Sequence, residues 1–289
     1  MRLFYLEDQK GERFPLNNET GVFLYQPNGL GIEYSNDYGE SGSGFYLRVK
    51  DGISQSEIGF TLVFPPSTDS PYVRYRKFID WIYAAEELYL IYCPYGSYEY
   101  YRRIEFRTIE KTEIQQDGSL QSAASVLPLT PWYLPSPINI DFSGDQENIM
   151  RYEYYYTDDL IYGVSSTDYT ASIESRGHMP SAVKVTFKGE VINPKLTLRG
   201  VVTRNEIGVC EITETFSQGD TLVFCSAEQD SYVKKIDSEG HETDLLDKID
   251  ITSNPFFRVP LSEPCELSIT GTGIYGQASM VQYVYYRGV

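Results

Sequence analysis

The stretch YRKFIDWIYAAEELYLIYCP, residues 75–94, is the only part of this sequence with the pattern of a helix that runs directly into a strand. Phe78, Trp81 and Ile82 recur at helical spacing and form one apolar face. We predict a helix over about residues 72–87 whose apolar face covers a sheet. The rest of the chain has the composition of a β protein, because aromatic residues make up 15% of it and Tyr (26) outnumbers Phe (14), a mixture that suits half-buried sheets.

Strand patterns lie on both sides of this helix. SEIGFTLVFPP, residues 56–66, precedes it, and Ser70 and Pro71 suit the cap and the first helical position, where the missing N–H of proline needs no partner. The two segments after the helix, residues 88–94 and 99–114, are predicted to pair as strands around a turn. The helix is therefore expected to connect two strands of one sheet.

The first fifty residues predict a hairpin followed by an exposed arm. RLFYLEDQKGERFPL, residues 2–16, places two apolar runs around a turn at Gly11. QPNGLGIEYSNDYGESGSGFYLRV, residues 26–49, distributes five glycines among polar residues, and this spacing predicts no regular element before Phe45. We expect a long exposed arm or loop there.

A change in amino-acid composition indicates a domain boundary. LPLTPWYLPSP, residues 127–137, contains four prolines, which are typical of an extended linker and not of a central strand, so we place the boundary near Ser136, beside Trp132 and Tyr133. The residues that follow form short strand patterns about ten residues apart, which is the spacing of an all-β sandwich. The predicted fold class is mainly β, with two β domains: a sheet-like or barrel-like first domain with one covering helix, and a second β-sandwich domain.

Composition excludes several classes of function. The formal charge of −17 argues against a phosphate-binding surface, so we expect no specific nucleic-acid binding. The charged start, MRLFYLEDQKGERF, lacks the apolar core of a signal peptide, and no segment has the roughly 20 apolar residues of a membrane helix, so we expect a cytoplasmic origin and no membrane insertion. The four cysteines lack metal-ligand spacing and are expected to be free and buried: Cys93, Cys210, Cys225 and Cys265. No metal or cofactor is expected.

Candidate catalytic groups are few. His178 and His241 both lie in turn-like segments and are interpreted as solvated. The adjacent acids Asp158–Asp159 and Glu86–Glu87 would point to opposite faces of a strand, so neither pair suits a glycosidase.

Two further motifs resemble ligand-binding loops. DSEGHETD offers Asp237, Glu239 and Asp244 to calcium, without the regular alternation of oxygen ligands that calcium loops have. A literal G-x-G-x-x-G at Gly271, Gly273 and Gly276 precedes a strand pattern and no helix, so we interpret it as a turn and not as a dinucleotide fingerprint. We therefore predict that the protein is not an enzyme.

The order of several loose motifs carries a family resemblance. GLG after the first hairpin, YRKFIDWI followed by LYLIYCP, then YYRRIEFRTIEKTEI and LTPWYLP resemble the amino-terminal domain of the siphophage distal tail protein family. GHMPSAVKVTFKGEVINPKLTL, GDTLVF and NPFFRVPLSEPCELSITGTG resemble the carboxy-terminal domain of that family, a galectin-like sandwich. The resemblance spans essentially the whole chain.

This resemblance implies a structural virion protein. Members of the family form a ring, typically hexameric, at the tail tip, which joins the tail tube to the tip, fibre or receptor-binding proteins and forms part of the DNA channel. The expected location is the phage tail tip, after assembly in the bacterial cytoplasm. In such a ring the candidate inter-subunit arm carries Tyr34, Tyr38, Phe45 and Tyr46, because the arm has little to pack on in its own domain. The negative charge would also let DNA pass without sticking.

The resemblance also implies how the chain ends. ASMVQYVYYRGV, residues 278–289, alternates with apolar groups on both faces, and family members of this type can return their last strand to the first domain. We predict that residues 281–289 pair with a strand from residues 1–135. The domains would then be 1–135 plus 281–289, and 136–280.

One alternative from another class is a lectin-like module that recognises saccharide on the host surface. Both tryptophans lie outside the second domain, so the aromatic platform would have to come from tyrosines. The candidates are Tyr152, Tyr154, Tyr155, Tyr156 and Tyr162.

Overall fold

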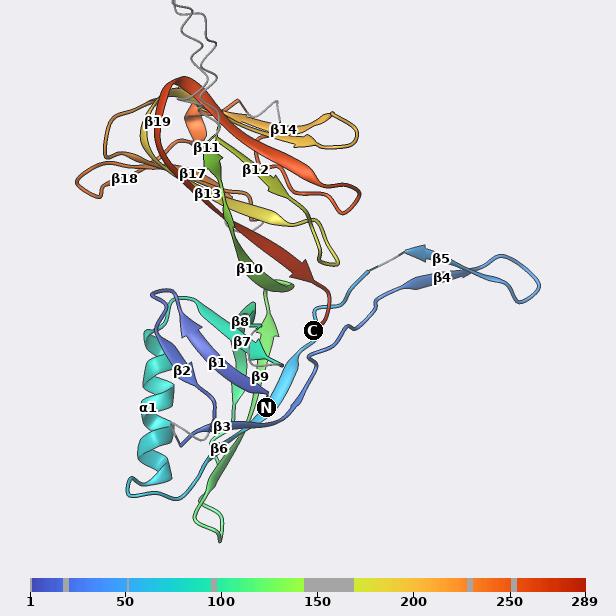
Figure 1. Cartoon of the computed structure of the whole chain (residues 1–289). Helices are drawn as coiled ribbons and strands as arrows, with labels where there is room; N and C mark the ends of the chain where they lie inside the picture. The colour runs from blue at the N-terminus through green and yellow to red at the C-terminus, as the bar shows by residue number, and fades with distance from the viewer. Residues whose placement is uncertain are drawn as a thin grey trace, which may run out of the picture. The chain divides into compact units, whose positions relative to one another are not determined.

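The structure, a computed structural model, describes residues 2–17, 21–50, 52–94, 98–142, 169–227, 231–250 and 254–289. The chain divides into two compact units (Figure 1). Unit 1 consists of Met1–Leu134 and Tyr285–Val289, and unit 2 of Pro135–Val284. Antiparallel strands dominate both units, and the described residues contain a single α-helix, so the predicted fold class is confirmed as mainly β.

Unit 1 is built on one curved antiparallel sheet. Its strands, in chain order, are β1 (Leu3–Asp8), β2 (Arg13–Pro15), β3 (Phe23–Asn28), β6 (Ile58–Phe64), β7 (Leu88–Cys93), β8 (Tyr100–Ile109) and β9 (Leu120–Pro128). They pair in the order β3–β6–β9–β8–β7–β1–β2. Leu24 at one edge donates its N–H to the carbonyl of Leu16 beyond the other edge, at 3.3 Å, so the sheet nearly closes into a barrel.

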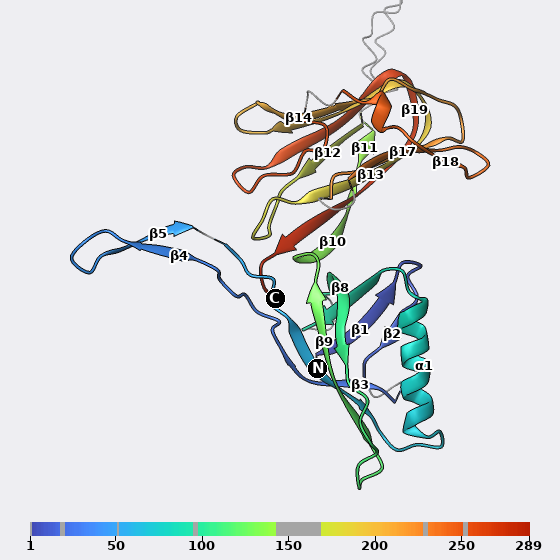
Figure 2. The same cartoon turned by 180° about the vertical axis from the view of Figure 1, so that it is seen from behind.

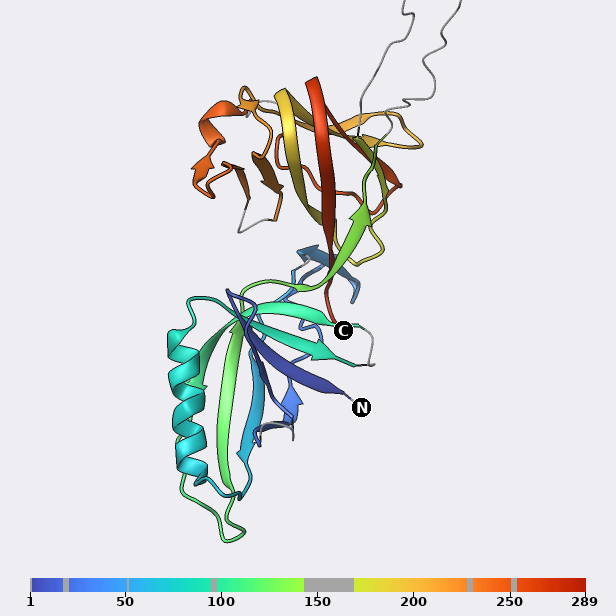
Figure 3. The same cartoon turned by 60° about the vertical axis from the view of Figure 1, so that its left-hand side comes forward.

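The helix covers one face of this sheet, as the sequence predicts. α1 (Pro71–Ala84) connects β6 to β7 and lies along the sheet (Figure 3). Phe78 is fully buried, with its ring 5.2 Å from Phe14 and 6.0 Å from Phe64. Trp81 and Ile82 pack beside it, against the core cluster of unit 1. Burial of a Phe side chain stabilises a fold by roughly 2–3 kcal/mol, so this face fixes the helix on the sheet.

The helix is shorter than predicted at its carboxyl end. Ala85 already has an extended backbone, and the N–H groups of Glu86 and Glu87 donate to the Gln9 Oε1 atom at 3.1 and 3.4 Å. A contact from a distant segment therefore replaces the last helical turn. Ser70 occupies the predicted cap position, but its side chain makes no capping hydrogen bond.

Two segments for which the sequence predicts no regular structure are strands. β4 (Asp37–Glu40) and β5 (Tyr46–Lys50) pair with each other in the glycine-rich region, so a regular element begins before Phe45. β10 (Trp132–Asn139) contains Pro135 and Pro137, which were predicted to be part of a linker. β10 pairs with β8 at Tyr133↔Tyr101 and also pairs with β19, so the predicted linker is part of the sheet.

Unit 2 contains the remaining elements. They are β11 (Asp141–Phe142), β12 (Tyr169–Ile173), β13 (Ala182–Gly200), β14 (Glu206–Glu211), β15 (Thr215–Phe216), β16 (Thr221–Cys225), β17 (Tyr232–Ile236), β18 (Glu242–Asp244), η1 (Leu246–Lys248) and β19 (Cys265–Tyr286). The long strands β13 and β19 run side by side through two strand arrays (Figure 3). One array is β11–β12–β19–β13–β14, and the other is β19–β13–β16–β17–β18. A single apolar cluster forms the core of the unit.

Glycines lie where β13 and β19 bend, and the turn predicted at Gly271, Gly273 and Gly276 is wrong. β19 continues through all three, and its register with β13 shifts near Ile192. A Cβ atom on Gly276 would lie 2.3 Å from the Lys188 carbonyl oxygen, so only glycine allows this close approach. The predicted short strands within residues 182–200 and 265–286 are therefore parts of two long, bulged strands, whereas those within residues 206–236 are separate strands.

The chain returns to unit 1 over its last five residues. Residues 281–283 pair with β13 in unit 2, so this part of the prediction for residues 281–289 is wrong, since the 19-residue β13 extends far enough to hold them. Tyr285 lies 6.1 Å from the ring of Tyr133, and Tyr286 lies 5.4 Å from the ring of Tyr100. Residues 285–289 are thus part of unit 1.

Candidate assembly surface

The most exposed part of unit 1 is a two-stranded hairpin, which we call the arm (residues 33–54). It leaves the sheet of unit 1 in both views (Figures 1 and 2). Ser35 N–H donates to the Gly52 carbonyl at 2.9 Å, and the bridge Tyr34↔Ile53 continues the pairing toward the sheet. At the tip, Gly42, Ser43 and Gly44 all have positive φ, which lets the chain reverse within a few residues.

Large apolar side chains of the arm face solvent. The exposed fraction is 73% for Phe45, 67% for Tyr46 and 73% for Val49. The candidates Tyr34 and Tyr38 are also more than half exposed. A contiguous group of exposed aromatic and aliphatic side chains is typical of a surface that another protein covers.

The two faces of the hairpin differ. Gly39 lies opposite Leu47, and the lack of a side chain at Gly39 leaves room for Val49, whose Cγ2 atom would lie 2.9 Å from a Cβ there. The other face carries Tyr38 opposite Arg48. One face of the two strands therefore carries aliphatic side chains, Leu47 and Val49. The other face carries aromatic rings together with charged groups.

Three contacts hold the root of the arm on the sheet. Gln55 Nε2 donates to the Pro128 carbonyl at 2.8 Å. Gly29, with φ +77°, lies so close to Glu57 that a Cβ would be 2.2 Å from its carbonyl oxygen. A Cβ on Gly288 would lie 3.0 Å from Ile32 Cγ1, so the end of the chain packs against the same root.

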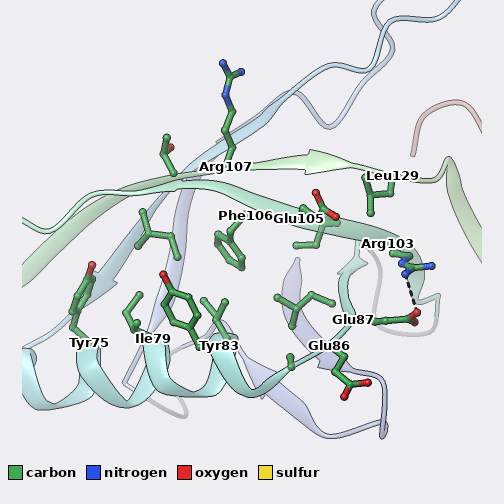
Figure 4. Close-up of a pocket in the computed structure, with 16 residues that line it drawn as sticks. Tyr75, Ile79, Tyr83, Glu86, Glu87, Arg103, Glu105, Phe106, Arg107 and Leu129 are labelled. Atoms are coloured by element: carbon green, nitrogen blue, oxygen red, sulfur yellow. Dashed lines mark ion pairs between the residues drawn. The ribbon is translucent and has the colours of Figure 1, made fainter.

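A groove of about 540 Å³ runs between α1 and β8. Figure 4 shows Tyr75, Ile79 and Tyr83 pointing from α1 toward the strand that carries Phe106. At one end Arg103 Nη2 forms an ion pair with Glu87 Oε1 at 2.8 Å. Apolar and charged side chains line this groove together, and Arg103 and Glu87 at its end pair with each other.

A polar network stabilises the opposite hairpin, β1–β2. Arg13 donates two hydrogen bonds to the Glu99 carboxylate, at 3.0 and 2.8 Å, and one to Glu7 at 2.7 Å. The bonds from Arg13 hold the pKa of the Glu99 carboxyl below its usual range, and burial raises the pKa of the Tyr101 phenol. This network fixes strands to one another and leaves no free base.

The described candidate groups Asp237 and Glu87 are held in structural contacts. Asp237 Oδ1 accepts the N–H groups of Glu239 and His241, each at 2.9 Å, so this carboxylate closes a turn. Glu87 is held by Arg103 and by the hydroxyl of Tyr89. Over the described ranges no group of three or more His, Cys, Asp or Glu side chains could hold a metal ion.

The four cysteines are buried and form no disulfide, as the sequence predicts. Burial raises the pKa of the Cys210 thiol to about 12 and that of Cys265 to about 11, so these thiols are protonated and inert at neutral pH. Among the residues that the structure covers, no helix is long and apolar enough to span a membrane.

Several predicted residues lie outside the described residues. These are the tyrosines considered for a saccharide platform, Tyr152, Tyr154, Tyr155, Tyr156 and Tyr162, together with the acidic pair Asp158–Asp159. The boundary residues are described: Trp132 is fully buried in unit 1, and Tyr133 stacks on Tyr101 at 5.7 Å. Sequence reasoning missed one buried polar site, formed by Arg102 beside Trp132, because a basic residue in an alternating strand gives no sign of which face it occupies.

Comparison with known proteins supports the family resemblance. Residues 3–127 match the family model described as the N-terminal domain of distal tail protein, which confirms the resemblance for that part of the chain. A chain in the structure of the phage P2 baseplate, in its activated conformation with calcium, is 16% identical over 100% of both chains, with a TM-score of 0.72. The Dit protein of phage SPP1, described as a paradigm of the hub adsorption apparatus, is 10% identical over 97% of both chains, with a TM-score of 0.54. At such identities these two structures show a shared fold, and a comparison with curated protein sequences finds no match.

Proposed function

We propose that this chain is a structural protein of a phage tail tip, on the premise that its residues 3–127 match the N-terminal domain of distal tail proteins. That match is the observation that carries the proposal. The shared fold with a chain of the phage P2 baseplate over the whole length supports it, because it covers unit 2 as well as unit 1.

We further propose that the protein closes into a ring, with six copies as the expected number. The exposed arm supports self-association, since an isolated two-stranded hairpin is marginally stable in water and gains order from a surface that covers it. Its exposed side chains Phe45, Tyr46 and Val49 would lie on the neighbouring copy. A closed ring lets each copy donate one arm and receive one.

The ring would connect the tail tube to the tip, fibre or receptor-binding proteins and form part of the DNA channel in the virion. The formal charge of −17 supports a channel role, because a negative lumen repels phosphates and DNA passes without binding. The protein acts here as a scaffold without a cofactor and not as an enzyme. Its partners are copies of itself and other tail proteins.

The test is the oligomeric state of the purified full-length protein, measured by light scattering and negative-stain images across a concentration series. The arm variant Phe45→Ser/Tyr46→Ser is expected to lower association at least tenfold. Tyr275→Ser is the matched control, because Tyr275 is 68% exposed but lies in unit 2, outside the arm. Its association should equal that of the unaltered protein. A protein that stays monomeric at high concentration, and is never seen as a ring in phage particles, contradicts the proposal.

A further inference from the structure

Two neighbouring side chains at the start of β10 in unit 1 carry buried hydrogen-bond donors without partners among the described residues. The Arg102 side chain enters from β8, and the residue is only 8% exposed. Trp132 is fully buried. The Nη1 atom of Arg102 and the Nε1 atom of Trp132 are both inaccessible to solvent, and neither has an acceptor within the described part of the chain. Buried donors are rarely left unpaired, because each costs about 1–3 kcal/mol.

The two side chains belong to one cluster. The guanidinium carbon of Arg102 lies 5.4 Å from the centre of the Trp132 ring, and Arg102 Nε donates to the Thr130 carbonyl at 2.9 Å. Tyr92 lies 6.1 Å from Trp132 and stacks on Phe4. The two donors therefore belong to side chains that contact each other in a mostly aromatic environment.

The positive charge of Arg102 also lacks a counter-charge. Burial lowers the pKa of its guanidinium to about 10, which still leaves it protonated at neutral pH. No ion pair to Arg102 forms among the residues that the structure describes. Its chain neighbour Arg103 shows the usual solution, since it pairs with Glu87 at 2.8 Å. A lone buried charge is strongly unfavourable unless an opposite charge reaches it.

We propose that Arg102 and Trp132 form a binding site for one small monovalent anion, either chloride or a carboxylate group. Such an anion accepts hydrogen bonds from both donors and offsets the charge, whereas a water molecule would supply only the lone pairs. The site is closed to solvent, so the anion enters through local opening of unit 1 and exchanges slowly. This inference is independent of the proposed ring, because all its residues lie within unit 1.

The fluorescence emission of Trp132 reports whether an anion binds at the site. The chain has only two tryptophans, so Trp81→Phe leaves Trp132 as the single one. Emission and thermal unfolding of this variant are measured in chloride, in formate and in isethionate, a much larger anion, at constant ionic strength and pH. We expect the emission to change and saturate with chloride or formate, and the unfolding midpoint to rise by about 3 °C. A response to formate alone assigns a carboxylate, and a response to chloride alone assigns a halide.

The matched variants are Arg102→Met and Arg103→Met in the Trp81→Phe background. Arg103→Met should keep the anion response, because its guanidinium belongs to the Glu87 pair. Arg102→Met should lose it; if that variant does not fold, the titration of Trp81→Phe alone still decides. Identical emission and midpoints in all three anions would overturn the proposal and leave water as the acceptor. An unchanged response in Arg102→Met would overturn it as well.

Discussion

Unit 1 contains two hairpins with similar turns, of which one is partly buried in the sheet and the other is exposed to solvent. β1–β2 and β4–β5 each reverse direction at a glycine with positive φ, Gly11 and Gly42. Along β1 every second residue is buried, whereas all five residues of β5 are exposed. Local sequence therefore decides that a hairpin forms, and the surroundings decide whether it is part of a core.

The difference comes from a third strand. β1 pairs with β7 along its whole length, and the helix packs against the same sheet through Phe78. β4–β5 forms a separate two-stranded sheet. A hairpin with a third strand and a covered face is stable, and one without them depends on a partner. The arm is thus the part of unit 1 whose order should change most on assembly.

The largest expected effect comes from deleting residues 285–289. Tyr285 is 8% exposed and Tyr286 packs on Tyr100, so the deletion should destabilise unit 1 by about 4 kcal/mol and also loosen the arm root near Ile32. Thermal unfolding followed by Trp fluorescence reports this loss, because both tryptophans lie in unit 1. Unit 2, followed by differential scanning calorimetry, should keep its own transition. If unit 2 unfolds and unit 1 does not change, the last residues belong to unit 2 and the prediction is wrong.

A sharper contrast compares one leucine in each hairpin. Leu6→Ala, at a fully buried position of β1, should lower the free energy of unfolding by about 3 kcal/mol. Leu47→Ala, at a position 61% exposed in β5, should change it by less than about 0.5 kcal/mol but weaken self-association. Denaturant titration gives the first quantity and light scattering the second. Equal losses of stability in the two variants would mean that the arm is packed on its own unit.

The parts of this fold that local sequence could predict are those whose cause is local. The apolar spacing of Phe78, Trp81 and Ile82 predicts a helix, and the Gly11 turn predicts a hairpin, because neighbours within a few residues determine both. The long strand β19 could not be predicted. From the local sequence, Gly276 is predicted to lie in a turn. Only the close approach of Lys188, on a distant strand, explains why a continuous strand has a glycine at this position.

The arm and the Arg102 site also depend on contacts between distant segments, which local sequence does not predict. Glycine spacing predicts the exposed arm, but not the pairing of Gly39 with Leu47 that makes it a hairpin. The Arg102 site depends on register: Arg102 lies opposite Leu90, a fully buried residue, so it faces the interior. A one-residue shift would place Arg103 inside instead. Register is set by strand pairing across the sheet, which sequence alone does not show.

A smaller effect is expected from the turn glycines. Gly11 and Gly42 both have positive φ, and a Cβ atom at either would meet nothing within 4 Å, so alanine introduces the same backbone strain in both hairpins. Gly11→Ala should lower the free energy of unfolding by about 1 kcal/mol. Gly42→Ala should leave global unfolding unchanged, because the arm opens on its own, and should instead speed amide exchange of Phe45, whose N–H donates to the Gly42 carbonyl. A loss of global stability in Gly42→Ala would contradict the independence of the arm.

The smallest expected effect is the change in stability with pH that comes from the Glu99 carboxyl. The Glu99 carboxyl has a pKa below its usual range because Arg13 donates hydrogen bonds to it, so the folded state favours the ionised form. The stabilisation is fully present above the pKa of an unfolded Glu and is lost as the pH falls through the lower pKa of the folded state. The Glu99 side chain is 40% exposed, so solvent screening limits the effect to about 0.5 kcal/mol. The free energy of unfolding of Glu99→Gln should therefore be lower than that of the unaltered protein at pH 7, and the two values should converge below about pH 4.

Glu40→Gln in the exposed arm is the control, and its stability should follow that of the unaltered protein at every pH. A constant difference between Glu99→Gln and the unaltered protein from pH 7 to pH 3 would show that packing, and not the ion pair with Arg13, explains the loss.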